Sequence, residues 1–121
     1  MVAPGEVICP ATRLVDGGDG FRFEVDLGHG LLQAFAVRHH GRVVAYLNRC
    51  AHIPVELDWQ PGHFIDDTGN YLICATHGAT YDPASGACLA GPCRGARLIP
   101  VPVLEQDGMI RLSACLTTSY G

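Results

Sequence analysis

The sequence predicts an all-β protein, an antiparallel β-sandwich or barrel formed by one domain over residues 1–121. Segments in which apolar and polar residues alternate recur along the chain, and turn-forming residues separate them. No segment keeps a helical period for three turns. The length of 121 residues gives room for one hydrophobic core and for no separate catalytic domain.

The first half of the chain contains three predicted strands. Residues 21–27 alternate apolar and polar side chains, as a half-buried strand does. A glycine-rich turn at 28–30 separates them from a second strand at 31–37. The turn at 39–42 then leads into the apolar run 43–47, which we expect to be the third strand.

The second half contains two predicted hairpins. In the first, the turn at 66–70 joins Phe64-Ile65 to residues 71–73. In the second, the turn at 105–108 joins residues 98–104 to 109–112.

Pro100 and Pro102 place the segment 98–104 at a sheet edge, because proline cannot donate a ladder hydrogen bond. The stretch from about 48 to 97 is rich in glycine and proline, and we expect it to be a loop region. Within it, residues 55–59 have room for one short helical turn.

Charge and composition exclude several classes of function. The net charge is −4, and all eight cations are arginines without a basic cluster, which argues against a nucleic-acid surface. The apolar runs are too short to span a membrane, and no signal peptide is visible. We therefore expect a cytoplasmic protein that binds no nucleic acid and no membrane. In that compartment, clustered cysteine and histidine favour metal or redox chemistry over structural disulfides.

The predicted loop region contains two short motifs that combine cysteine with histidine. Cys50 and His52 form the first box, Cys-x-His, and Cys74 and His77 form the second, Cys-x-x-His. Two irons bridged by two sulfides offer four terminal positions, which these four side chains can fill. Zinc is the competing interpretation, although zinc fingers usually group the cysteines in one pair and the histidines in the other.

The two boxes and the residues around them resemble the cluster-binding boxes of Rieske [2Fe–2S] proteins. The similarity covers 48–52 and 72–82, and residues 85–92 are similar to the turn and proline loop of that family. The resemblance implies one [2Fe–2S] cluster in a Rieske-like fold, with a cluster-binding portion at about 48–97 and a β base from the flanking segments. The residues that it assigns to the cluster are Cys50 and Cys74 on one iron, His52 and His77 on the other, and Tyr81 and Pro92 in the surrounding shell.

Three positions depart from the respiratory-chain members of this family. Val55 and Thr76 stand where those proteins have two disulfide-forming cysteines, so that bridge cannot form here. Ala79 stands where they have a serine whose hydroxyl bonds to a bridging sulfide. Hydrogen bonds to sulfur stabilise the reduced cluster, so we expect a potential toward the lower end of the mixed-ligand range.

The remaining cysteines and histidines receive no ligand role. Cys88 and Cys93 form a small disulfide, two thiols or a redox-active pair, and the sequence leaves these alternatives open. Cys9 and Cys115 are expected to be small core residues. We expect the other histidines to lie on the surface, with the adjacent His39 and His40 on opposite faces of a strand; these histidines are His29, His39, His40 and His63.

These features together suggest a one-electron carrier. The chain has no glycine fingerprint for a dinucleotide and no room for a mononuclear iron domain, so we do not expect it to be an enzyme on its own. The resemblance implies transfer from a flavin reductase to a terminal oxygenase or reductase. The alternatives are a small Rieske subunit of a nitrite-reductase-like complex and a zinc-bound or cluster-free interaction module. Acidic residues near the boxes either dock a positively charged partner or are merely solvated; they are Glu56, Asp58, Asp66 and Asp67.

Overall fold

The structure is a computed structural model, and it describes residues 6–26, 31–49, 57, 62–66, 68–74, 78–91 and 96–113. No helix in these ranges is long and apolar enough to cross a membrane. The elements in chain order are β1 (Val7–Pro10), a 3-10 helix η1 (Ala11–Arg13), β2 (Phe21–Asp26), β3 (Leu31–His39), β4 (Arg42–Leu47), β5 (Leu72–Ile73), β6 (Thr80–Tyr81), β7 (Cys88–Ala90), β8 (Val103–Gln106) and β9 (Met109–Leu112).

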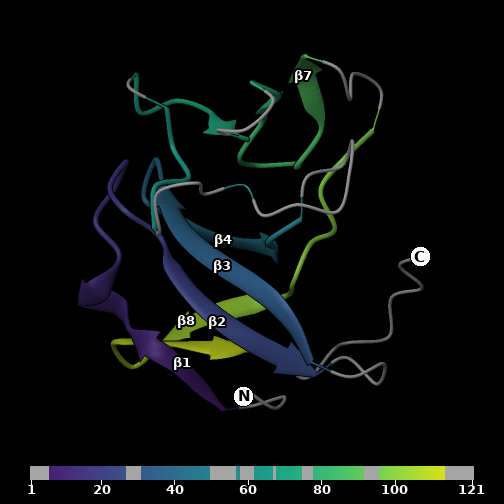
Figure 1. The fold of residues 1–121 in the computed structure, drawn as a ribbon. Coiled ribbons are helices and arrows are strands. Elements are labelled where there is room, and N and C mark those ends of the chain that lie inside the picture. The colour runs from purple at the N-terminus through teal and green to yellow at the C-terminus, as the bar shows by residue number, and fades with distance from the viewer. Residues whose placement is uncertain are drawn as a thin grey trace.

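The strands form three antiparallel sheets of three strands each. Two of them, in the orders β2-β3-β4 and β1-β9-β8, make a base in which β4 lies beside β8. The third, in the order β5-β6-β7, lies beyond the base, at the top of Figure 1. The predicted all-β sandwich is therefore confirmed, with an additional small sheet that we call the upper sheet.

Strand β3 is the centre of the molecule because both of its faces are buried. Phe35 and Val37 face the upper sheet, and Ala34 and Ala36 face the interior of the base. Successive residues of a strand point to opposite faces, so a run of buried residues at 34–37 requires cover on both sides.

Two hydrophobic cores result from this arrangement. We call the one inside the base the base core, and the one between β3, β4 and the upper sheet the upper core. Phe35 of β3 stacks on Phe64 in the upper core, with ring centroids 4.0 Å apart and planes 8° apart. The buried members of the upper core are Phe35, Val37, Tyr46, Leu57, Phe64, Ile65, Leu72, Cys74, Ala79, Tyr81, Cys88 and Leu98.

Tight two-residue turns close two of the hairpins. His40 and Gly41 join β3 to β4 with φ of 51° and 78°, and Asp107 and Gly108 join β8 to β9 with φ of 54° and 76°. Positive φ at both central residues is the type I′ geometry, whose twist matches that of the paired strands. The sequence predicted a turn at each of these positions.

Arg38 ties the N-terminal segment to both sheets of the base. Its guanidinium donates to the carbonyl oxygens of Leu14 at 2.9 Å and Ala11 at 3.2 Å. It also forms a two-pronged ion pair with Glu105 of β8, at 3.1 and 3.2 Å. The Arg38 side chain is 16% exposed and that of Glu105 is 42% exposed, and the two-pronged geometry orients the two groups relative to each other.

The structure differs from the sequence prediction in two strands. Strand β1 was not expected, and it pairs with β9 at the other end of the chain. The predicted strand at 98–104 was wrong in its extent, because β8 begins only at Val103. Pro100 and Pro102 lack the N–H groups that would extend the ladder; Pro100 instead forms an isolated bridge with Tyr46.

The stretch from 48 to 97 is more ordered than the expected loop region, since it contains the upper sheet. The predicted hairpin at 64–73 is confirmed: Ile65 bridges Leu72, and the Ile73 N–H donates to the Phe64 carbonyl oxygen at 2.9 Å. The strands β6 and β7 were not expected. The predicted short helical turn falls mostly outside the described residues.

Candidate metal centre

The second box begins at Cys74, directly after β5. Cys74 is fully buried, and its backbone is bonded in both directions: its N–H donates to Ala79 O at 2.8 Å and its carbonyl accepts from Gly78 N at 2.7 Å. Gly78 has φ of 72°, which closes the turn. The structure therefore places one predicted ligand on a tight, hydrogen-bonded turn. His77 lies outside the described residues.

The first box lies outside the described residues, but both of its flanks are described. Asn48 and Arg49 precede Cys50, and Leu57 follows the segment 50–56. Leu57 is fully buried in the upper core, to which Cys74 also belongs. Leu57, which follows the first box, thus belongs to the same core as Cys74, the first residue of the second box.

Tyr81 and Cys88 face the same core from the upper sheet. Tyr81 of β6 is fully buried and pairs with both Leu72 and Cys88. Cys88 is a thiol whose Sγ donates to Ala90 O at 3.3 Å. The family resemblance also implies a hydrogen bond from the Tyr81 hydroxyl to a cysteine sulfur, and this bond stays a prediction. Cys93 lies outside the described residues.

The proline loop approaches the second box closely at Gly91. A Cβ atom on Gly91 would lie 2.8 Å from the Ala79 Cα and 3.3 Å from its N, and the φ of Gly91 is 101°. Only glycine fits this backbone conformation and this contact. The sequence pattern included Gly91 beside Pro92 but did not indicate that the glycine packs against Ala79. Pro92 itself lies outside the described residues.

The residues around Cys74 fit an iron–sulfur group. Thiolate and imidazole donors are the ligands of such clusters, and Cys74 offers its sulfur from a rigid turn in an apolar core. The described part of the chain has no group of three His, Cys, Asp or Glu residues able to hold a metal ion. Cys74 is the one predicted ligand within that part.

Cys9 behaves differently from Cys74, as the sequence predicted. It is a free thiol in the base core, only 3% exposed, and burial raises the pKa of its thiol against the smaller opposing effect of Arg13 and Arg38. A neutral buried thiol is unreactive, so Cys9 has a packing role. Cys115 lies outside the described residues.

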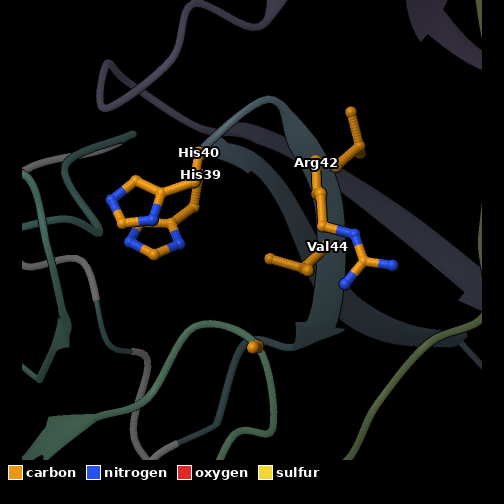
Figure 2. Close-up of a pocket in the computed structure, with 6 residues that line it drawn as sticks. His39, His40, Arg42 and Val44 are labelled. Carbon is orange, nitrogen blue, oxygen red and sulfur yellow. The ribbon is translucent and has the colours of Figure 1, made fainter.

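The prediction that His39 and His40 lie on opposite faces was wrong. Their rings stack with centroids 3.8 Å apart and planes 20° apart, as Figure 2 shows. The positive φ of His40 breaks the alternation of the strand and turns its side chain to the face of His39. His40 and His63 are exposed, as expected. His29 lies outside the described residues.

The two stacked rings border a cavity of about 490 Å³ between the β3–β4 hairpin and the turn at 83–85. Val44 points toward the rings across this space in Figure 2. The described residues that line the cavity are His39, His40, Arg42, Val43, Val44 and Ala84. Cys74, the one predicted ligand within the described residues, is not among them.

Comparison with known proteins assigns the family. The model of the Rieske [2Fe–2S] domain matches residues 7–109, so the chain belongs to the Rieske [2Fe–2S] domain family. Its cofactor is one [2Fe–2S] cluster.

Solved structures similar to this chain include two ferredoxins. The ferredoxin of Sphingomonas yanoikuyae B1 has a TM-score of 0.69 and 23% identity, over 90% of this chain and 97% of its own. The ferredoxin of carbazole 1,9a-dioxygenase from Nocardioides aromaticivorans IC177 has a TM-score of 0.70 and 18% identity, over 91% and 97%. These similarities establish the fold.

A curated relative is the oxidoreductase NdmD of Pseudomonas putida. It is 36% identical over an alignment 77 residues long, and the match covers 58% of this chain. The chain spans only 12% of the length of that relative. The matching region is therefore a small part of a much longer oxidoreductase.

Proposed function

We propose that this protein is a one-electron carrier whose [2Fe–2S] cluster is held by Cys50 and Cys74 on one iron and by His52 and His77 on the other. Tyr81 and Pro92 complete the surroundings of the cluster. The observation that supports this most directly is the turn at Cys74, where a predicted ligand sits fully buried between two backbone hydrogen bonds. The cluster-binding portion that we propose is 48–97.

When bound, the cluster supplies one electron at a time at a potential that its ligands and their neighbours set. The chain contributes a dry, rigid support: Cys74, Ala79 and Tyr81 are each fully buried in the upper core. Ala79 has no hydroxyl to donate to a sulfide, so this position favours a low potential for the class.

The partners that we propose are a flavin reductase and a terminal oxygenase. One supporting fact is that a solved structure similar to this chain is the ferredoxin in a complex of reduced oxygenase and oxidised ferredoxin in carbazole 1,9a-dioxygenase. That similarity, with a TM-score of 0.69, covers 90% of this chain and 92% of the other. Electron transfer between such proteins needs only a small, transient interface.

A second candidate is a Rieske unit within a longer reductase, of which a nitrite-reductase-like complex is one form. The match to NdmD favours it, because there a region like this one belongs to a much longer oxidoreductase. A cluster-free module is disfavoured because both boxes keep all four ligands. A zinc-bound module is disfavoured because each box combines one cysteine with one histidine, whereas zinc fingers usually pair the cysteines and pair the histidines. Isolation of the protein from its natural host, followed by identification of what copurifies, separates the two electron-transfer candidates.

Asp66, one of the acidic residues near the boxes, holds the turn before β5. Its carboxylate accepts from the Thr68 hydroxyl at 2.7 Å and from the Tyr71 N–H at 3.4 Å. Glu56, Asp58 and Asp67 lie outside the described residues, and contact with a positively charged partner stays a proposal for all four. Cytoplasmic location likewise stays a proposal.

Spectroscopy of the purified protein tests the proposed site. We expect a red-brown protein with two irons per chain and, after reduction, the low-average-g EPR signal of a Rieske centre. His77→Ala should abolish this signal, and His39→Ala, a change outside the proposed ligand set, should leave it intact. A colourless protein that contains zinc would contradict the proposal.

A further inference from the structure

Asn48 stands out as a polar side chain in an apolar environment. Among the residues that the structure describes, it is the one buried side chain of a polar or charged type, with only 4% exposed. It follows β4 directly and lies two residues before Cys50. Burying an amide costs free energy unless its hydrogen-bonding groups find partners. The buried position of Asn48 therefore needs a physical explanation.

The side chain of Asn48 joins the two ends of the segment that contains the first box. Its Oδ1 accepts a hydrogen bond of 2.8 Å from the backbone N–H of Leu57, nine residues further along the chain, and the bond is buried. Leu57 is fully buried in the upper core. The bond therefore fixes the position of Leu57, which follows the segment 50–56, relative to Asn48, which precedes it.

The backbone at this point is anchored as firmly as the side chain. The Asn48 N–H donates to Gln33 O of β3 at 2.8 Å, and the preceding Leu47 N–H donates to Ile99 O at 2.9 Å. Asn48 therefore cannot shift without disturbing the base. The Asn48 Oδ1 atom therefore connects Leu57 to the base.

The hydrogen bonds described at the two boxes differ in kind. Among the described residues, the ends of the second box are joined by backbone hydrogen bonds, between Cys74 and Ala79 and between Gly78 and Cys74. The ends of the first segment are nine residues apart, and the bond that joins them is made by a side chain. Because Leu57 and Cys74 share one core, the Asn48–Leu57 bond relates the first box to the second.

We propose that Asn48 is a positioning residue for the cluster: its Oδ1 holds the first box at the distance from Cys74 at which Cys50 and His52 can bind the same cluster as Cys74 and His77. This inference rests on the proposed ligand set. It adds that the affinity for the cluster depends on a hydrogen-bond acceptor that does not touch the cluster.

Three substitutions at Asn48 distinguish the effect of its hydrogen-bond acceptor from the effect of its side-chain volume. Asn48→Asp keeps the acceptor, Asn48→Leu keeps the approximate size without an acceptor, and Asn48→Ala removes both. We expect iron release to a chelator to be faster by about tenfold or more in the Leu and Ala variants, since the Leu57 N–H is then buried without a partner. The Asp variant should release iron at close to the wild-type rate.

Two further measurements distinguish positioning from general stability. The EPR line of the Leu variant should broaden, because the first box then occupies several positions, and hydrogen exchange of a peptide containing Leu57 should accelerate. Val25→Ala lowers stability by opening a cavity in the base core and should leave the EPR line unchanged. Asn70→Ala makes the same truncation as Asn48→Ala in an exposed turn and should match the wild type in every measurement.

Either of two results would overturn the inference. One is iron release at the wild-type rate in Asn48→Leu, and the other is release in Asn48→Asp as fast as in Asn48→Leu. If the wild-type protein bound no [2Fe–2S] cluster at all, the proposed function would be wrong. The exchange of the Leu57 peptide would still show whether Asn48 closes this segment.

Discussion

The hydroxyl of Tyr46 donates a hydrogen bond of 2.6 Å to the carbonyl oxygen of Pro83. Tyr46 belongs to β4 of the base, and Pro83 lies in the turn between β6 and β7 of the upper sheet. Both residues are buried, and a Cβ on Gly86 of the same turn would lie 2.8 Å from the Tyr46 ring. Tyr46 therefore connects the base to the turn of the upper sheet through both its hydroxyl and its ring.

Tyr46→Phe should destabilise the protein by about 1–2 kcal/mol, because it removes the hydroxyl and leaves the Pro83 carbonyl without this donor. The ring and its packing against the turn remain. Urea unfolding followed by circular dichroism measures the loss. Tyr71→Phe, which removes the hydroxyl of an exposed tyrosine, is the control and should have little effect. Equal stability of Tyr46→Phe and the wild type would show that the hydrogen bond contributes nothing.

We expect the contribution of Tyr46 to stability to be lost in alkaline solution. Burial, aided by the charge of Asp82 and opposed by Arg97, raises the pKa of Tyr46 to about 12. Because the folded state holds this proton more tightly than the unfolded state, its contribution to stability is intact below about pH 10 and declines as the pH rises from there toward 12. The difference in unfolding free energy between wild type and Tyr46→Phe should therefore shrink over this range. A difference that stays constant would mean that the Tyr46 pKa is not raised.

Gly91→Ala should be among the most damaging changes to the proline loop. The new Cβ meets the Ala79 backbone at 2.8 Å and the φ is 101°, so we expect a loss of about 3 kcal/mol from strain and overpacking. Gly69→Ala is the matched control, because Gly69 has φ of 77° but nothing within 4 Å of the added atom. It should lose only about 1 kcal/mol. Unfolding in urea compares the two, and equal losses would contradict the close approach of the loops.

Ala79→Ser should raise the midpoint potential. A hydroxyl at this position supplies the missing donor to sulfur, and a bond stronger by about 1 kcal/mol in the reduced state shifts a one-electron potential by about 40 mV. Protein-film voltammetry measures the shift. Ala84→Ser places the same hydroxyl at an exposed site and should leave the potential unchanged. A wild-type potential as high as that of respiratory members would contradict the expected effect of Ala79.

We expect the contribution of Asp66 to stability to be lost in acid. Partial burial acts to raise its pKa, but hydrogen bonds from the Thr68 hydroxyl and from the backbone of Tyr71, Asn70 and Thr68 outweigh it and hold the pKa below its usual value. Its contribution is therefore present above the unfolded pKa of about 3.9 and is lost as the pH falls through the lower folded value. Asp66→Asn should flatten this part of the acid profile in thermal unfolding. Asp19→Asn, at an exposed position, should leave it unchanged.

The parts of the fold that the sequence predicted are those with a local cause. The alternation at 21–27 and the apolar segments at 31–37 and 43–47 correspond to β2, β3 and β4, because strand patterning repeats every two residues. The turns at 40–41 and 107–108 were predicted from their glycines. The ligand set was predicted from the spacing of two boxes, since a cluster with four terminal positions constrains which residue types can surround it.

Other features depend on residues that are distant in sequence, and only the tertiary structure decided them. Strand β1 exists because β9 offers it an edge more than a hundred positions along the chain. The stacking of His39 on His40 depends on one positive φ, which no residue pattern predicted.

The sequence by itself determined the class of fold, the family resemblance and the candidate ligands, because strand periodicity and ligand spacing are recorded in consecutive residues. The tertiary structure alone decided that Asn48 bonds to Leu57, that Tyr46 bonds to Pro83 and that Gly91 packs on Ala79. Each of these contacts joins separate segments, and its energy depends on burial that arises only when the base and the upper sheet come together.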